Sequence, residues 1–270
     1  MKVNVMDISN AKVGELNLPA QFKEEFRPDI IHRAVLALQS NAMQPYGAAP
    51  EAGKRVSAKL SRRRRKFKTS YGIGISRVPR KIMSRSGTRF NWVGALAPGT
   101  VGGRQAHPPK PSKILQKKIN IKERLKAIRS AIAATMDREI ISARGHKIPK
   151  EFPFVVENKI EGLSKTKEVT NVLEKLGFSD EISRTEKRKI RAGKGRLRGR
   201  RYQSKKSLLI VISKDSKIMQ SASNIQGVDI VNVRNLNAEL LAPGAKPGRV
   251  TLWTKGAVEL LGKENLFEQK

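Results

Sequence analysis

The sequence predicts a three-layer α/β/α protein with a mainly parallel, open sheet and a long irregular basic loop. Short apolar segments alternate with helical ones from residue 152 onward. This pattern is typical of a parallel sheet that is covered by helices on both faces. By contrast, residues 52–122 contain 20 Lys or Arg and no Asp or Glu, so this stretch lacks the composition of a packed core.

The amino-terminal region predicts a hairpin followed by a helix. Residues 2–8 and 12–18 alternate apolar and polar side chains on either side of a turn, as two paired strands do. Pro28 suits the first turn of a helix. One apolar stripe then extends to about Asn41, through Ile30, Ile31, Ala34, Val35 and Leu38. We expect this stripe to pack on the sheet.

A second helix is predicted from Asn120, which with Glu123 forms a candidate capping box. Apolar residues at helical spacing continue to Ile140, and Gly145 is the expected stop. This helix is also expected to pack on the sheet. The remaining predicted elements are strand 152–156, helix 165–176 closed by Gly177, strand 207–212, a short helix near 215–222, strand 228–233, helix 235–241, strand 249–253 and a last helix from about Lys255.

The chain is predicted to divide into a globular body and an extended insertion. We assign residues 1–43 and 112–270 to the body and residues 44–111 to a basic loop that penetrates RNA. Between Pro45 and Pro111 lie seven of the thirteen prolines and nine glycines, with almost no helical or alternating apolar period. An irregular loop of this length is expected to be functional or disordered.

A second basic insert is predicted over residues 184–206. From Lys187 to Lys206 there are eleven Lys or Arg and no carboxylate. Three glycines are expected to keep its backbone flexible, namely Gly193, Gly195 and Gly199. This segment is therefore interpreted as another RNA-contacting arm.

The charge selects the class of partner. The chain has 56 Lys or Arg against 23 Asp or Glu, which gives a formal net charge of +33. The excess is spread over long stretches rather than confined to one amphipathic helix, so nucleic acid is favoured over a membrane surface. A solvated basic surface is the alternative.

Composition also bears on cofactors and location. The chain has no cysteine, which excludes disulfides and thiolate metal sites and fits a reducing compartment. The histidines His32, His107 and His146 are far apart in sequence, so we expect no metal site and no cofactor. No apolar run approaches the roughly 20 residues of a membrane span, and we expect a cytoplasmic protein with no membrane partner.

Motifs of nucleotide-binding enzymes are not matched. The glycines of residues 193–199 have the wrong spacing for a dinucleotide loop and precede a strand. Residues 244–248 are followed by Arg249, where a phosphate loop needs Lys and then Ser or Thr. Glu157 and Asp215 have no His or Cys neighbour in sequence, and Asp215 is expected to cap a helix. We expect no catalytic residues and no small-molecule substrate.

Residues 62–66, RRRRK, form the densest cationic run. Guanidinium groups bind phosphates in fork geometry and stack on bases, whereas a localisation signal or a solvated linker is the alternative. Tyr71, Phe90 and Trp92 lie among cations and glycines and are expected to pack on bases or sugars, with core burial as the alternative. The candidate RNA-binding residues are Lys54, Arg55, Lys59, Arg62, Arg63, Arg64, Arg65, Lys66, Lys68, Tyr71, Arg80, Lys81, Arg85, Arg89, Phe90, Trp92, Arg104, His107, Lys110, Arg188, Arg191, Lys194, Arg196, Arg198, Arg200 and Arg201.

Several segments, taken together, resemble one protein family. They are SRRRRKFK at residues 61–68, YGIGISRVPR at 71–80, MSRSGTRFNWVG at 83–94, GGRQAHPPK at 102–110 and TLWTKGAVELL at 251–261. Their order, with the strand pair and the first two helices, resembles the ribosomal protein four family of the large subunit in its archaeal and eukaryotic form. The resemblance covers essentially the whole chain.

The resemblance implies a structural protein of the large ribosomal subunit whose loop threads through ribosomal RNA and aids assembly. Phosphate contacts and counterion release would offset the entropy of ordering the loop. The tip, about residues 72–80, would reach the peptide exit tunnel and form its constriction with the protein twenty-two family. The implied tunnel-lining residues are Gly74, Ile75, Ser76 and Arg77. Ribosomal RNA and neighbouring ribosomal proteins would be the partners.

Two other classes stay open at this point: a nonribosomal RNA chaperone or chromatin-type protein, and an RNA-processing enzyme. Co-sedimentation with large subunits in high salt would separate the first from a ribosomal protein. A pocket with converging acids at the strand ends would support the second.

Overall fold

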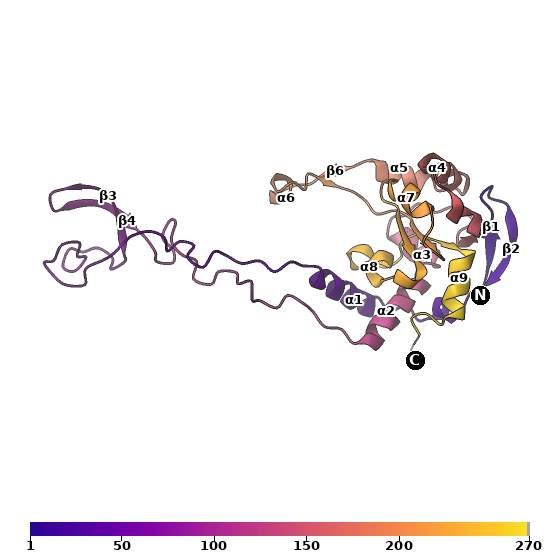
Figure 1. Cartoon of the computed structure of the whole chain (residues 1–270), viewed down its shortest axis with the longest axis horizontal. Coiled ribbons are helices and arrows are strands. Elements are labelled where there is room, and N and C mark those ends of the chain that lie inside the picture. The colour runs from indigo at the N-terminus through magenta and orange to yellow at the C-terminus, as the bar shows by residue number, and fades with distance from the viewer. Residues whose placement is uncertain (269–270) are drawn as a thin grey trace. The chain divides into compact units, whose positions relative to one another are not determined.

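The computed structural model describes residues 1–268, and these form two compact units (Figure 1). We call residues 1–42 together with the chain from 116 onward the body unit, and residues 43–115 the loop unit. The loop unit is inserted between the first and second helices of the body unit, and each unit is described by itself below.

The body unit is built on an open sheet whose strands are mainly parallel. In the described chain its order is β2-β1-β5-β10-β8-β9, with β2 antiparallel to β1 and the other neighbouring pairs parallel. The strands are β1 (Lys2–Met6), β2 (Lys12–Asn17), β5 (Phe154–Val156), β8 (Leu209–Ile212), β9 (Asp229–Asn232) and β10 (Thr251–Thr254). The predicted α/β class and the predicted amino-terminal hairpin are confirmed.

Helices cover both faces of this sheet, because alternate side chains of each buried strand point to opposite sides. One apolar cluster joins Val155, Val211 and Trp253 to α1 (Pro28–Asn41), α2 (Ile121–Ala133), α8 (Ala238–Leu241) and α9 (Lys255–Lys263). The other joins Val156, Ile210 and Leu252 to α3 (Arg138–Ala143), α4 (Thr166–Lys175) and α7 (Ile218–Ser223). The first helix and the 120s helix pack on the sheet as predicted. Short 3-10 turns occupy Ala20–Lys23, Asn158–Gly162, Val233–Asn235 and Pro243–Ala245.

The prediction of one helix from Asn120 to Ile140 is wrong in its extent. Helix α2 ends at Ala133, and the Asp137 side chain accepts a hydrogen bond from the Glu139 amide and starts α3 as a new helix. The capping box is also absent, because Asn120 makes no side-chain cap bond. An eight-residue helix, α5 (Ser179–Glu186), was not predicted.

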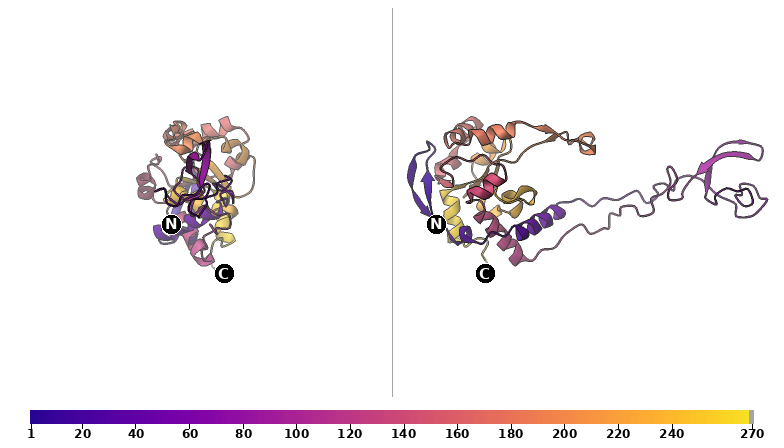
Figure 2. Two further views of the ribbon diagram at one scale, coloured as in Figure 1. Left: turned by 90° about the vertical axis from the view of Figure 1, so that its left-hand side faces the viewer. Right: turned by 180° about the vertical axis from the view of Figure 1, so that it is seen from behind.

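The loop unit contains a hairpin that was not predicted. Strands β3 (Arg80–Ser86) and β4 (Arg89–Gly94) are antiparallel and turn at Gly87 and Thr88 (Figures 1 and 2). The expectation of a segment without regular period is therefore wrong for residues 80–94.

The second insert has local structure as well. It comprises β6 (Lys189–Ile190), α6 (Lys194–Leu197) and β7 (Tyr202–Gln203), with β6 antiparallel to β7. Gly193 and Gly199 have φ values of 75° and 78°, so these glycines form the turns at either end of α6. They occupy specific turn positions, which corrects the expectation that they simply keep the backbone flexible.

Candidate RNA-binding surface

All of the candidate RNA-binding and tunnel-lining residues are at least partly accessible to solvent. None of them is buried, and the four arginines of residues 62–65 are exposed. Within residues 1–268, none of the candidate cations forms an ion pair with a carboxylate. Their charges are therefore available to a partner.

The arginine run lies on a small closed bend. The Ser61 amide donates to the Lys68 carbonyl at 3.1 Å, which joins the two ends of the run. Arg65 and Lys68 have φ values of 54° and 59°, in the left-handed region that side chains other than glycine rarely adopt. The run is therefore held in a bend and not along an extended strand.

Three aromatic rings pack against one another beside this run. Phe90 stacks on Trp92 with 5.1 Å between ring centroids and 28° between planes, and Phe67 meets the edge of Phe90 at 5.1 Å. Phe90 and Trp92 are half-buried, while Phe67 is 53% exposed. The loop unit thus forms a small aromatic cluster of its own, and each of the three residues keeps part of its surface accessible to solvent.

Arginines lie over aromatic rings of the loop unit. The guanidinium carbon of Arg80 is 5.3 Å from the Trp92 centroid, and that of Arg77 is 4.5 Å from the Tyr71 centroid. Such contacts hold a cation at a fixed place without neutralising it. Arg77 was predicted for the tunnel wall and Tyr71 for RNA, and the structure brings the two together.

The predicted tip comprises residues 72–80, and residues 72–79 form no strand; β3 begins at Arg80. Gly72 and Gly74 have φ values of 81° and 70°, so these glycines permit backbone turns there. Of the predicted tunnel-lining residues, Gly74, Ser76 and Arg77 are exposed and Ile75 is half-buried.

The two ends of the second insert are held to neighbouring parts of the body unit by hydrogen bonds of Arg184, Arg188 and Lys206; we call this place the root of the insert. The Arg184 guanidinium donates to the Lys206 carbonyl at 2.8 Å, and the Lys206 ammonium donates to Asp229 at 2.8 Å. Arg188 donates to the Gln226 side chain at 3.2 Å. Beyond this root the candidate cations from Lys194 to Arg201 are exposed.

A buried carboxylate supports this root. Glu181 on α5 accepts hydrogen bonds from Arg184 at 2.6 Å, from the Lys147 amide at 2.9 Å and from Ser207 at 3.1 Å. Burial raises the pKa of Glu181, but its bonds with His146 and Arg184 outweigh this and hold the pKa at about 2. No local sequence pattern indicates this group, because its partners are dispersed along the chain.

Arg249 is a second buried charge that sequence reasoning missed. It is fully buried at the start of β10, where it donates to the Ser207 carbonyl at 2.7 Å and to Asp229 at 2.6 Å. Burial raises the pKa of Asp229, but Lys206 and Arg249 outweigh this and hold it below its ordinary value. These bonds join the beginnings of β8, β9 and β10 to the root of the second insert.

Carboxylates at the other ends of the strands hydrogen-bond with neighbouring polar side chains. Asp215 accepts from the Asn232 side chain at 3.0 Å and does not cap α7, so its predicted capping role is wrong. Glu161, which was not singled out from sequence, accepts from Ser213 and Thr254. In residues 1–268 no cluster of three or more potential ligands could hold a metal ion. No helix in that part of the chain has the length and apolar character that crossing a membrane requires.

The fold and this surface define an α/β domain that carries two cationic insertions with unpaired charges. Residues 16–264 match the family described as Ribosomal protein L4/L1 family, and the chain belongs to it. The relatives include the large ribosomal subunit protein uL4 of Nanoarchaeum equitans, which is 49% identical and covers 99% of this chain and 100% of its own. The uL4 proteins of Methanothrix thermoacetophila and Archaeoglobus fulgidus are 47% and 46% identical, each over 97% of this chain and 98% and 99% of their own. These relatives are ribosomal proteins and not enzymes.

Proposed function

We propose that this large-subunit ribosomal protein binds large-subunit ribosomal RNA through the loop unit and the second insert, and that the loop helps RNA segments assemble. The relatives are named as proteins of the large ribosomal subunit, and we expect this chain to act there, in the cytoplasm. One observation carries the RNA proposal: residues 52–122 hold 20 cations and no carboxylate, and the candidate cations among them form no ion pairs in the described chain. Such a surface needs phosphate counter-charge.

The mode of binding that we propose combines phosphate and base contacts. The exposed arginines of residues 62–65 would neutralise phosphates, and the accessible parts of Phe67, Phe90 and Trp92 would pack on bases. The second insert would contact RNA in the same way from a root fixed by Arg184 and Lys206.

We further propose that residues 72–80 reach the peptide exit tunnel and contact the protein twenty-two family there. Residues 71–76 carry no charge, whereas cations flank them on both sides. Phosphate contacts would therefore lie beside the tip, and small or apolar groups would face the tunnel. The position in the tunnel rests on the family resemblance.

The RNA proposal is tested by changing Arg62, Arg63, Arg64 and Arg65 to alanine in the full chain. Affinity for large-subunit ribosomal RNA should fall, and its salt slope should decrease by roughly 0.7 to 0.9 for each phosphate that is no longer neutralised. The matched control changes the same positions to lysine, which keeps the charge and should keep most of the slope. An unchanged slope in the alanine variant, or a collapsed melting temperature, would contradict the proposal.

A further inference from the structure

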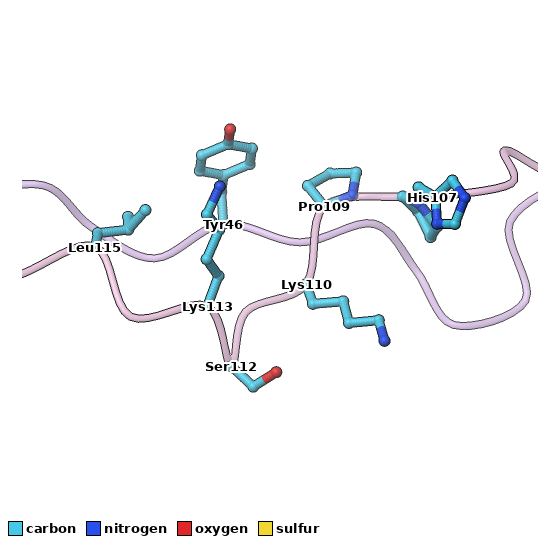
Figure 3. Close-up of a pocket in the computed structure, with 8 residues that line it drawn as sticks. Tyr46, His107, Pro109, Lys110, Ser112, Lys113 and Leu115 are labelled. Carbon is cyan, nitrogen blue, oxygen red and sulfur yellow. The ribbon is translucent and has the colours of Figure 1, made fainter.

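A hollow of about 540 Å³ lies between the outgoing and returning legs of the loop unit (Figure 3). Tyr46 lines it from the outgoing leg, and residues 107–115 contribute most of the returning side. The volume is within the roughly 300 to 1,000 Å³ typical of small-molecule sites, so a base with its sugar fits.

The two legs are held together at this point. The Ala48 amide donates to the Pro109 carbonyl at 3.0 Å. Gly47 lies against Pro111, and a Cβ added there would come within 2.9 Å of the Pro111 nitrogen. Only glycine allows the two legs to approach this closely. Backbone contacts between the legs therefore define one end of the hollow.

The lining combines an open aromatic ring with cations. Tyr46 is 68% exposed and makes no aromatic contact in the described chain. Lys110 and Lys113 line the hollow with it; in Figure 3 the Lys113 side chain runs from the returning leg toward Tyr46, whereas the Lys110 side chain points away from that ring. Prolines 108 and 109 form a stiff apolar wall, and no carboxylate lines the hollow.

We infer that this hollow holds one extruded nucleotide of RNA, with its base stacked on Tyr46 and its phosphate against Lys113. The inference rests on the proposed RNA binding of the loop. An exposed ring with no aromatic partner gains most from a flat base, because every base offers a face for stacking. Lys113 is opposite in charge to a phosphate, and unpaired lysines with no carboxylate lining the hollow favour a nucleic acid over a protein segment.

The test measures binding of the full chain to protein-free large-subunit ribosomal RNA at several salt concentrations. Tyr46→Ala should lose roughly 5- to 150-fold in affinity at an unchanged salt slope, because stacking does not release counterions. Tyr46→Phe keeps the ring and should bind nearly as the parent does. Lys113→Ala should lower the salt slope by roughly 0.7. Ile114→Ala is the matched control, because Ile114 is 85% exposed and does not line the hollow.

Chemical probing of the RNA gives a second readout. A base-specific alkylating reagent should find one nucleotide protected by the parent chain and by Tyr46→Phe, and reactive with Tyr46→Ala. The Ile114→Ala control should keep this protection.

Two results would overturn the inference. The first is a Tyr46→Ala chain with unchanged affinity and footprint. The second is a Tyr46→Ala chain that binds protein-free RNA normally but is missing from subunits reconstituted with the other proteins, which would assign the hollow to a protein segment. The variant with alanine at residues 62–65 separates the two proposals. If its salt slope falls while Tyr46→Ala binds RNA as the parent does, the nucleotide site is refuted and the proposed RNA binding stands. If neither variant changes binding, the proposed function fails as well.

Discussion

The carboxylate of Glu181 lies 2.7 Å from Nδ1 of His146, and both side chains are buried. The same carboxylate accepts a hydrogen bond from Ser207, whose neighbour Lys206 is the last residue of the second insert. This contact couples the interior of the body unit to the place where the insert returns. An arm without an apolar core is thereby fixed at its base by a buried polar network.

Glu181→Gln should remove a pH-dependent part of the free energy of unfolding. The folded pKa of Glu181 is about 2 against an ordinary 4.5, so its contribution is fully present above about pH 4.5 and is lost as the pH falls toward 2. The stability difference between the parent and the variant should therefore shrink by ~2 kcal/mol between pH 7 and pH 3. Chemical denaturation at both pH values measures it. A difference that does not change with pH would contradict the assignment.

Arg249→Leu should destabilise the body unit by about 3 to 5 kcal/mol, because it removes the buried donor to the Ser207 and Leu240 carbonyls and leaves Lys206 as the remaining cation on Asp229. The matched control is Arg234→Leu, which breaks an ion pair with Glu264 on the surface. Surface pairs contribute only about 0 to 1 kcal/mol, so this variant should unfold almost as the parent does. Urea denaturation of both chains checks the prediction, and equal destabilisation of the two would refute it.

Deleting residues 73–78 should leave RNA affinity and assembly largely intact, because it removes only one cation, Arg77. What should change is the passage of nascent chains, or the binding of drugs that lodge in the exit tunnel. Sedimentation of large subunits and a drug-binding assay measure the two effects. If the variant is excluded from subunits while its body unit folds, residues 72–80 anchor assembly and the proposed tunnel position is wrong.

Changing Arg196, Arg198, Arg200 and Arg201 to alanine should weaken RNA binding without changing the melting temperature. These side chains are exposed, and their removal leaves Glu181 and Arg249 in place. The salt slope should fall by up to roughly 0.7 to 0.9 for each arginine that neutralises a phosphate. Lysine at the same four positions is the control. A melting temperature that falls with the slope would show that these arginines belong to the fold.

Most of the fold could be predicted because apolar periodicity is a local signal. The continuous apolar run of strand β8 and the apolar stripe of helix α4 are each evident within a few residues. The break between α2 and α3 could not be found in this way, because apolar spacing continues through it to Ile140. It depends instead on the cap that Asp137 provides. The β3 and β4 hairpin had a weak signal in the alternation of Phe90 and Trp92, which the surrounding cations obscured.

The sequence predicted which residues form the candidate RNA-binding surface, but it did not predict the contacts that hold them in place. Charge runs locate cations such as Arg62 on the surface, since unpaired charges are rarely buried. The buried groups Glu181 and Arg249 look like any other charged residues in sequence, and their partners come from distant segments. Tyr46 could be recognised as a candidate only after the structure placed it opposite residues 107–115.

The place of β10 in the sheet has a consequence for biosynthesis. This strand pairs with β5 on one side and β8 on the other, although it comes from residues 251–254, near the end of the chain. While the chain is being translated, β1 and β5 can pair. The position between β5 and β8 stays empty until residues 251–254, which form β10, leave the ribosome. The sheet therefore closes only after all of its other strands have been synthesised. A message truncated before codon 251 would yield a chain with all the cations of its two insertions and no closed core to carry them.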